Sequence, residues 1–125
     1  MKFFDLNFAI NQRSLSNHLG YSLITSNGNC MHVNGMSALT NCFQSGHSRS
    51  SCEAFCTSQT SCVGYMFGNY TPSRCWLFPS ESRCPSGFHL YRLTLATSKN
   101  DLVAKPFSGN VCYGKNLGKT LKLDW

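Results

Sequence analysis

Hydrophobic and polar residues alternate in short runs from Tyr21 onward, and turn-forming residues separate these runs. Residues 23–25 are β-prone, residues 26–29 form a turn cluster of Ser, Asn and Gly, and residues 30–33 make a second short strand that ends at Asn34-Gly35. This pattern predicts that the packed part of the chain begins near Tyr21 with a pair of short strands.

The middle of the chain predicts a β-hairpin. Residues 62–67 and 73–78 are both rich in aromatic and β-branched residues, and the loop at 68–72 contains Gly, Asn and Pro. Pro79 lacks a backbone N–H and is expected to end the second strand. Further strands are predicted over two segments, an alternating one at 88–94 and a last one at 110–113.

One helix is predicted over residues 51–58. Ser50 is followed three residues later by Glu53, the spacing of a capping box that begins a helix. Cys52 and Cys56 are four residues apart and therefore share one helical face. A single helix among several strands joined by short connections predicts an α+β fold, with the helix packed on a mainly antiparallel sheet.

The chain of 125 residues fits one domain flanked by two segments of different character. Residues 1–20 show no sustained period and are interpreted as an N-terminal arm or leader. Residues 21–115 form the predicted domain, and residues 116–125 form a basic C-terminal tail. The segment MKFFDLNFAI is a poor signal sequence, because Asp5 and Asn7 interrupt its apolar run. No apolar stretch in the sequence is long enough to predict a membrane span.

Cysteine usage gives the strongest compositional signal. An even number of thiols, eight in 125 residues, is expected when each is paired in a disulfide, and disulfides persist in secreted and extracellular proteins. Zinc coordination by thiolates is the alternative, but the sequence contains no C-x-x-C pair. We therefore expect an extracellular, disulfide-bonded protein with cysteines at these positions: Cys30, Cys42, Cys52, Cys56, Cys62, Cys75, Cys84 and Cys112.

Several of these cysteines resemble a known signature. Residues 52–56 (CEAFC), 62–65 (CVGY) and 74–77 (RCWL) are similar in order and spacing to the C-x-x-x-C, C-x-(Gly/Ala)-(Tyr/Phe) and C-x-L motifs of PAN/Apple domains. Residues 30–33 and 112–113 resemble the first and last strands of that family. The resemblance implies the pairs Cys52–Cys75, Cys56–Cys62 and Cys30–Cys112, and the remaining Cys42–Cys84 pair follows by elimination.

The sequence holds few groups for catalysis, and we do not expect an enzyme. It has only five acidic residues and four histidines, and it lacks the motifs of serine hydrolases, zinc proteases and phosphate-binding loops. His32 and His89 lie on predicted strands and are candidates for a shared metal site, although histidines on strands more commonly have no such role. We expect no metal, no cofactor and no nucleic-acid partner.

The net charge of +6 favours negatively charged partners. Lys115, Lys119 and Lys122 recur through the C-terminal residues and are candidate polyanion ligands, the alternative being a solvated terminal segment. Arg49 and Arg83 are candidates for a second basic cluster, together with Arg74 of the hairpin.

The hairpin carries the most specific candidate binding residues. Tyr70, Arg74 and Trp76 combine aromatic faces with a guanidinium, groups that bind sugars and acidic glycans, although a core role for Trp76 is equally open. Asn69 begins an N-glycosylation sequon, Asn-Tyr-Thr, and a glycan there would argue against ligand binding at this loop.

The first functional hypothesis is an adhesion or lectin-like recognition module that binds carbohydrate or an extracellular protein, the ligand classes that the PAN/Apple resemblance implies. A second hypothesis is a structural subunit that self-associates through its terminal segments into a matrix or filament. A secreted toxin or inhibitor is a third. The sequence alone leaves all three open.

Overall fold

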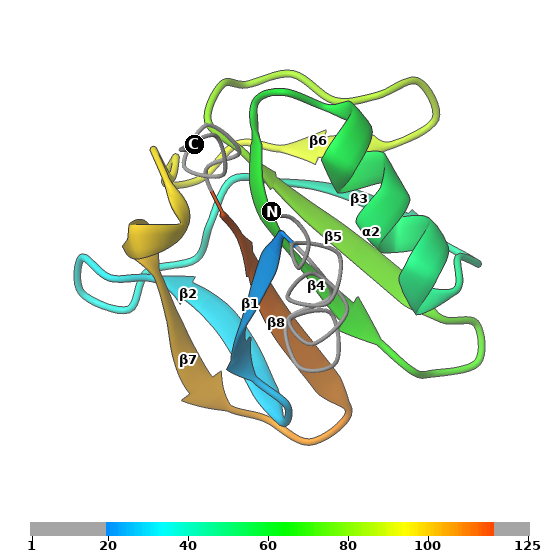
Figure 1. Cartoon of the computed structure of the whole chain (residues 1–125), viewed down its shortest axis with the longest axis horizontal. Helices are drawn as coiled ribbons and strands as arrows, with labels where there is room; N and C mark the ends of the chain where they lie inside the picture. Colours follow the sequence, from blue (N-terminus) through cyan, green and yellow to red (C-terminus); the bar gives the residue numbers. More distant parts are fainter. Residues whose placement is uncertain (1–19, 117–125) are drawn as a thin grey trace, which may run out of the picture.

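The computed structural model describes residues 20–116, which form one α-helix, a short 3-10 helix and eight strands (Figure 1). Within this part of the chain the elements follow one another in this order: β1 (Tyr21–Thr25), β2 (Gly28–His32), β3 (Asn41–Ser45), α2 (Arg49–Ser58), β4 (Cys62–Gly68), β5 (Arg74–Pro79), β6 (His89–Tyr91), η1 (Lys99–Asp101), β7 (Leu102–Pro106) and β8 (Asn110–Lys115).

The strands form two antiparallel sheets. Six strands make the main sheet in the order β1-β8-β4-β5-β3-β6, and β2 pairs with β7 in a second, two-stranded sheet. Figure 1 shows α2 lying along β4 and β5, with β2 and β7 set apart from them beyond β8. One helix on a mainly antiparallel sheet confirms the predicted α+β class. No helix among residues 20–116 is long and apolar enough to cross a membrane.

All eight cysteines are paired, and the four pairs are those expected. Cys52 and Cys56 lie on the buried face of α2, which is therefore tied to β5 and to the start of β4. The third pair ties the two-stranded sheet to the main sheet, and the fourth ties β3 to the loop after β5. The pairs are Cys52–Cys75, Cys56–Cys62, Cys30–Cys112 and Cys42–Cys84.

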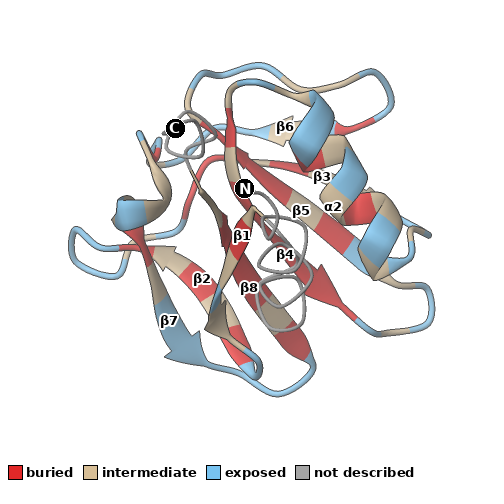
Figure 2. Cartoon of the chain, in the orientation of Figure 1, coloured by how far each residue is buried: buried red, intermediate tan, exposed pale blue. Residues whose placement is uncertain are grey.

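Side chains alternate between the two faces of the main sheet, so its strands contribute to two apolar clusters, and Figure 2 shows buried residues along the central strands. On the helix side, Tyr65 of β4 and Leu77 of β5 pack with the cysteines of α2. On the opposite side, Met66 and Phe78 pack with the Cys30–Cys112 disulfide under the two-stranded sheet. Both faces of β4 are therefore buried.

The predicted capping box is wrong. The helix begins two residues earlier than the box requires, and its N-cap is Ser48, whose hydroxyl accepts a hydrogen bond from the N–H of Ser51. Ser50 lies inside the helix. The Glu53 carboxylate instead accepts hydrogen bonds from Arg49 and Tyr65, so a tertiary contact takes the side chain away from the helix end.

The strand predictions need three further corrections. The turn at 26–29 is shorter than expected, because β2 already begins at Gly28. The strand at 88–94 is limited to β6, because the chain beyond Tyr91 leaves the sheet and the N–H of Leu93 bonds to the hydroxyl of Thr40. Two strands were not predicted, namely β3 and β7.

Candidate ligand-binding face

One half of the main sheet is uncovered on the side away from α2. The two-stranded sheet packs near β8 and β4, whereas β5, β3 and β6 extend beyond it. On these three strands Trp76 pairs directly with Phe43, and Phe43 pairs directly with His89. Direct partners in a sheet point to the same face, so the three rings lie in a row.

We call this surface the aromatic face. It begins at the β4–β5 hairpin, crosses β5 and β3, and ends at β6, the edge strand of the described sheet. Its residues combine partly or fully exposed rings with one guanidinium: Tyr70, Arg74, Trp76, Phe43, His89 and Tyr91.

The rings of the aromatic face contact one another. The ring centroids of Phe43 and Trp76 are 5.6 Å apart, and those of His89 and Tyr91 are 4.4 Å apart. Tyr91 keeps 48% of its surface exposed. Because the backbone ladder of three strands holds these side chains, the rings form a fixed surface that loses little conformational entropy when a ligand binds.

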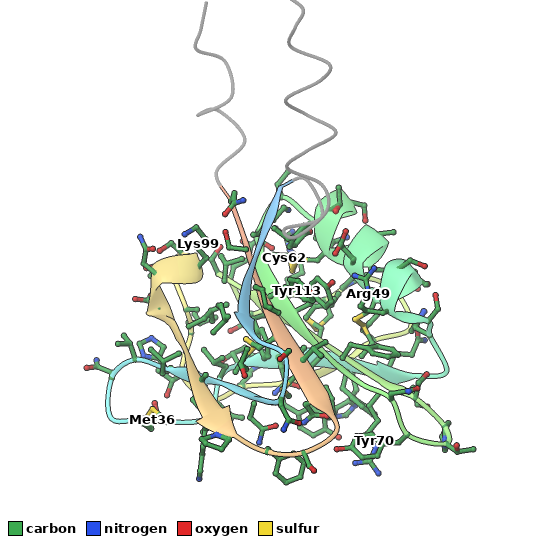
Figure 3. The ribbon with its side chains drawn as sticks, turned by 60° about the horizontal axis from the view of Figure 1, so that its bottom comes forward. Met36, Arg49, Cys62, Tyr70, Lys99 and Tyr113 are labelled. Atoms are coloured by element: carbon green, nitrogen blue, oxygen red, sulfur yellow. A yellow bond between two sulfur atoms is a disulfide. The ribbon has the colours of Figure 1, made fainter. Side chains whose placement is uncertain are left out.

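The hairpin end of the face holds a cation stacked on a ring. The guanidinium carbon of Arg74 lies 4.6 Å from the centroid of the Tyr70 ring. The Tyr70 hydroxyl donates to the carbonyl of Ser108 at 3.4 Å, and the ring lies where a side chain at Gly68 or Gly109 would be. Figure 3 shows Tyr70 at the opposite end of the molecule from Lys99 and Cys62.

Arg74 is available for a ligand. The residue is exposed, and no carboxylate among residues 20–116 forms an ion pair with it. A planar guanidinium can donate two parallel hydrogen bonds to a carboxylate or sulfate while it remains stacked on the tyrosine ring.

A groove of about 140 Å³ lies beside Trp76, between the main sheet and the segment that follows β2. Its walls are mostly apolar, with Met31, Leu39 and Phe78 among them. Asn29 and Asn41 are the polar residues of the lining. The Nδ2 of Asn41 donates to the carbonyl of Leu39 at 3.0 Å, while its Oδ1 is buried and has no protein hydrogen-bond partner. A buried acceptor without a partner is energetically costly. This oxygen has almost no exposed surface, so a ligand could bond to it only after the side chain moved.

Trp76 has the core role that the sequence left open, and its role in ligand binding stays a prediction. It is half-buried, and it packs against the second apolar cluster while one side remains at the groove and against Phe43. The fold therefore fixes this ring in place at the centre of the aromatic face.

The structure separates Arg49 from the aromatic face. Arg49 lies on α2, on the other side of the sheet, where it donates to Glu53 at 3.0 Å and to the Tyr65 hydroxyl at 2.7 Å. Tyr65 in turn donates to Glu53 at 2.6 Å. Burial, together with the hydrogen bond to Glu53, raises the pKa of Tyr65 far above its usual value, so the phenol stays protonated and can donate. This network stabilises the helix on the sheet.

The other basic candidates also lie elsewhere. Arg83 is exposed in the loop after β5 and pairs with Glu81 at 2.7 Å. Lys115 belongs to β8, and its ammonium donates to the carbonyls of Cys56 and Gln59 at the C-terminal end of α2. Burial lowers the pKa of Lys115. The remaining polyanion candidates, Lys119 and Lys122, lie outside the described residues.

The two histidines proposed as a metal pair lie in different sheets. His32 is buried in β2, where its Nδ1 accepts from the N–H of Asn34 and its Nε2 is 3.9 Å from Asp101. His89 belongs to the aromatic face. Within residues 20–116 no group of three potential metal ligands comes together.

Asn69 is exposed in the hairpin loop next to Tyr70, and its glycosylation stays a prediction.

Sequence reasoning missed three contributors to the aromatic face. The alternation at 88–94 places His89 and Tyr91 on one side of a strand, but nothing in the sequence connects them to the hairpin. Phe43 makes that connection, and β3 was not predicted.

A scan against models of protein families, a search of curated proteins and a search of solved structures each find no match, so geometry alone must support any function proposed for this face.

Proposed function

We propose that the chain is a non-catalytic extracellular recognition module of the PAN/Apple type, which binds a glycan on the aromatic face. The order of the cysteines, their pairing and the position of one helix on an antiparallel sheet support the PAN/Apple assignment. Four disulfides in a domain of this size fit a secreted or extracellular protein.

The observation that carries the proposal is the row of rings on one open face of a rigid sheet. The apolar C–H faces of a sugar pack well on flat aromatic rings, and Trp76 and Tyr91 offer such rings on either side of Phe43. The hydroxyls of the sugar need hydrogen-bond partners, and the exposed imidazole of His89 and hydroxyl of Tyr91 supply such groups on this face. The face therefore offers both kinds of contact that a saccharide requires.

The guanidinium of Arg74 extends this preference to acidic sugars. It lies two residues from Trp76 on the same strand face, within the same row of side chains. A saccharide stacked on Trp76 would place a carboxylate or sulfate of a neighbouring unit near Arg74.

Self-association is the second candidate, and one observation favours it. The outer edge of β6 has no partner strand in the described part of the chain, and the residues after it expose apolar side chains, with Leu93 at 58% and Leu95 at 39% of their surface. Unpaired edges next to exposed apolar residues favour strand-to-strand pairing between molecules. This route uses β6, whereas the assembly expected from the sequence used the terminal segments.

A glycan array probed at low and at high salt tests the proposal. Binding to defined sugars that persists at high salt is expected, because stacking on rings is not screened by ions whereas attraction by net charge is. Tyr91→Ala should weaken the binding of an array hit about tenfold. Leu23→Ala is the matched control, since it removes an exposed apolar side chain from β1 at the opposite edge of the sheet.

Two results would contradict the proposal. One is an equal loss of affinity in the Tyr91 and Leu23 variants. The other is an array that shows no binding, together with light scattering that increases with protein concentration and is abolished by Tyr91→Ala. That combination would assign this edge of the molecule to self-association instead.

A further inference from the structure

A pocket in the described part of the chain lies far from the aromatic face. It has a volume of about 260 Å³ and is lined by the loop between α2 and β4, the start of β4, the residue after β5, residues 97–100 and the end of β8. Figure 3 shows Lys99 and Cys62, both of which line it, at the end of the molecule opposite Tyr70. We call it the lysine pocket, and its polar lining includes Thr60, Ser80, Lys99, Lys115 and Asn116.

The lysine pocket has a strongly one-sided charge. Two lysines line it, and no acidic residue does so among the described residues. The nearby Asp101 carboxylate is already engaged, because its Oδ2 accepts from both the N–H and the hydroxyl of Thr97 at 2.8 Å. These hydrogen bonds lower the pKa of Asp101. Asp101 therefore stays negatively charged beside the pocket, but among the described residues no acidic side chain belongs to the lining itself.

The fold positions both lysines. Lys99 packs closely against β8 at Gly114, which has no side chain. A Cβ atom at position 114 would lie only 2.8 Å from the Cβ of Lys99. Lys115 is held by the carbonyls of Cys56 and Gln59 at 2.8 and 3.0 Å. An ammonium has three N–H donors, so Lys115 keeps one for a ligand.

Several other donors of the lysine pocket are unused. No acceptor in the described chain bonds to the Lys99 ammonium, and the hydroxyls of Thr60 and Ser80 have no partner there either. The Oδ1 of Asn116 accepts from the hydroxyl of Ser22 at 2.7 Å, which fixes its Nδ2 as a further donor. A pocket that offers many donors and little negative charge suits an oxyanion.

We propose that the lysine pocket binds an oxyanion, a sulfate or carboxylate group, as a second site independent of the aromatic face. Its volume is below the range of about 300–1,000 Å³ that drug-sized ligands fill, so it fits one charged group or one sugar unit. Two sources share this chemistry: a free inorganic anion and a sulfated or uronic-acid unit of an acidic saccharide.

The test is a titration of the full-length, ¹⁵N-labelled protein with inorganic sulfate, followed by NMR spectroscopy. Saturable shifts are expected for the backbone amides of Ser80, Lys99 and Asn116. Lys99→Ala should weaken sulfate binding about tenfold, because hydrogen bonds to charged groups are the stronger ones. Lys105→Ala is the matched control: it removes the same charge from an exposed position on β7 that does not line the pocket.

A neutral variant separates hydrogen bonding from net charge. Ser80→Ala leaves the charge at +6 and should still weaken sulfate binding several-fold. Repeating the titration with a sulfated disaccharide and with its desulfated form distinguishes the two sources: tighter binding of the sulfated sugar than of free sulfate indicates a saccharide, and equal binding indicates a free anion.

The proposal is overturned if sulfate produces no saturable shifts, or if Lys99→Ala and Lys105→Ala weaken binding equally. The aromatic face is tested separately, since Tyr91→Ala should leave the sulfate titration unchanged. A negative result at one site therefore does not affect the test of the other site.

Discussion

The two faces of the main sheet come from the same strands but differ in what covers them. On the helix side, Tyr65, Cys75 and Leu77 are almost fully buried under α2, and two disulfides fix the helix in place. On the other side, Trp76 and Phe43 remain half-buried at the uncovered end of the sheet. Adjacent residues of β5 thus enter either a closed core or an open surface.

This difference shows how a small domain can hold a rigid surface of exposed rings. The side chains of the open face contribute less to stability, because much of their area stays in water. They are nevertheless fixed, because every second residue of their strands is anchored in the closed face. The closed face and its disulfides therefore supply the rigidity that the aromatic face needs.

The largest expected effect comes from breaking the closed face. Replacing both Cys52 and Cys75 with alanine opens a link with a sequence separation of 23, and it should lower the free energy of unfolding by about 3–4 kcal/mol. Chemical denaturation followed by circular dichroism measures the loss. Tyr91→Ala on the open face should cost less than about 1 kcal/mol, and equal losses in the two proteins would refute the contrast between the faces.

A smaller effect comes from removing a single hydroxyl. Tyr65→Phe leaves Arg49 and Glu53 without their shared partner in a partly buried site, and should cost about 1–3 kcal/mol of unfolding free energy. Tyr91→Phe makes the same chemical change on the open face, where it should have an effect within about 0.5 kcal/mol. Denaturation midpoints of the two variants check this pair, and a Tyr65→Phe protein as stable as the parent would show that the network contributes nothing.

Much of the closed face follows from the sequence. The helix, the hairpin and the last strand have local signals, since Cys52 and Cys56 share a helical face and Pro79 ends a strand whether or not the rest of the domain is considered. The disulfides follow from the order of the cysteines once the family resemblance is accepted. Local spacing is sufficient here because the elements involved are near neighbours in the chain.

The open face depends on pairings that local patterns do not show. The sequence of β3, NCFQS, has only Cys42 fully buried, so it lacks the hydrophobic run that identifies a strand. Its pairing with both β5 and β6 brings the hairpin residues beside His89 and Tyr91. The capping-box error has the same origin, because Glu53 bonds to Tyr65, which lies on another element.

Alkaline pH provides a graded way to weaken the closed face. Burial raises the pKa of Tyr21 from 10.0 to about 12, while a hydrogen bond with Thr57 partly opposes this rise. A tyrosine whose pKa is higher in the folded than in the unfolded protein contributes stability at pH values below its unfolded-state pKa. This contribution is lost as the pH rises toward the folded-state pKa. The free energy of unfolding should therefore fall between about pH 10 and pH 12.

Denaturation at a series of pH values measures this fall. Tyr21→Phe removes the titrating group and should make the fall less steep, although Tyr65, whose pKa is also raised, should preserve part of it. If the free energy of unfolding does not change with pH in this range, burial does not raise the pKa of either tyrosine, and the prediction is wrong.

A small effect on stability is also expected for Arg74, and this residue separates binding from folding most sharply. Arg74→Ala removes an exposed stack on Tyr70 and should change the free energy of unfolding by less than about 1 kcal/mol. The same change should weaken the binding of an acidic glycan several-fold and reduce the salt dependence of that binding, because a charge in contact with the ligand is lost.

Arg83→Ala is the matched control, since it removes another exposed guanidinium, which pairs with Glu81 away from the aromatic face. Binding assays at two salt concentrations distinguish the two variants. If both weaken the glycan equally, the attraction comes from the net charge of the domain, and the open face has no special part in recognising the acidic group.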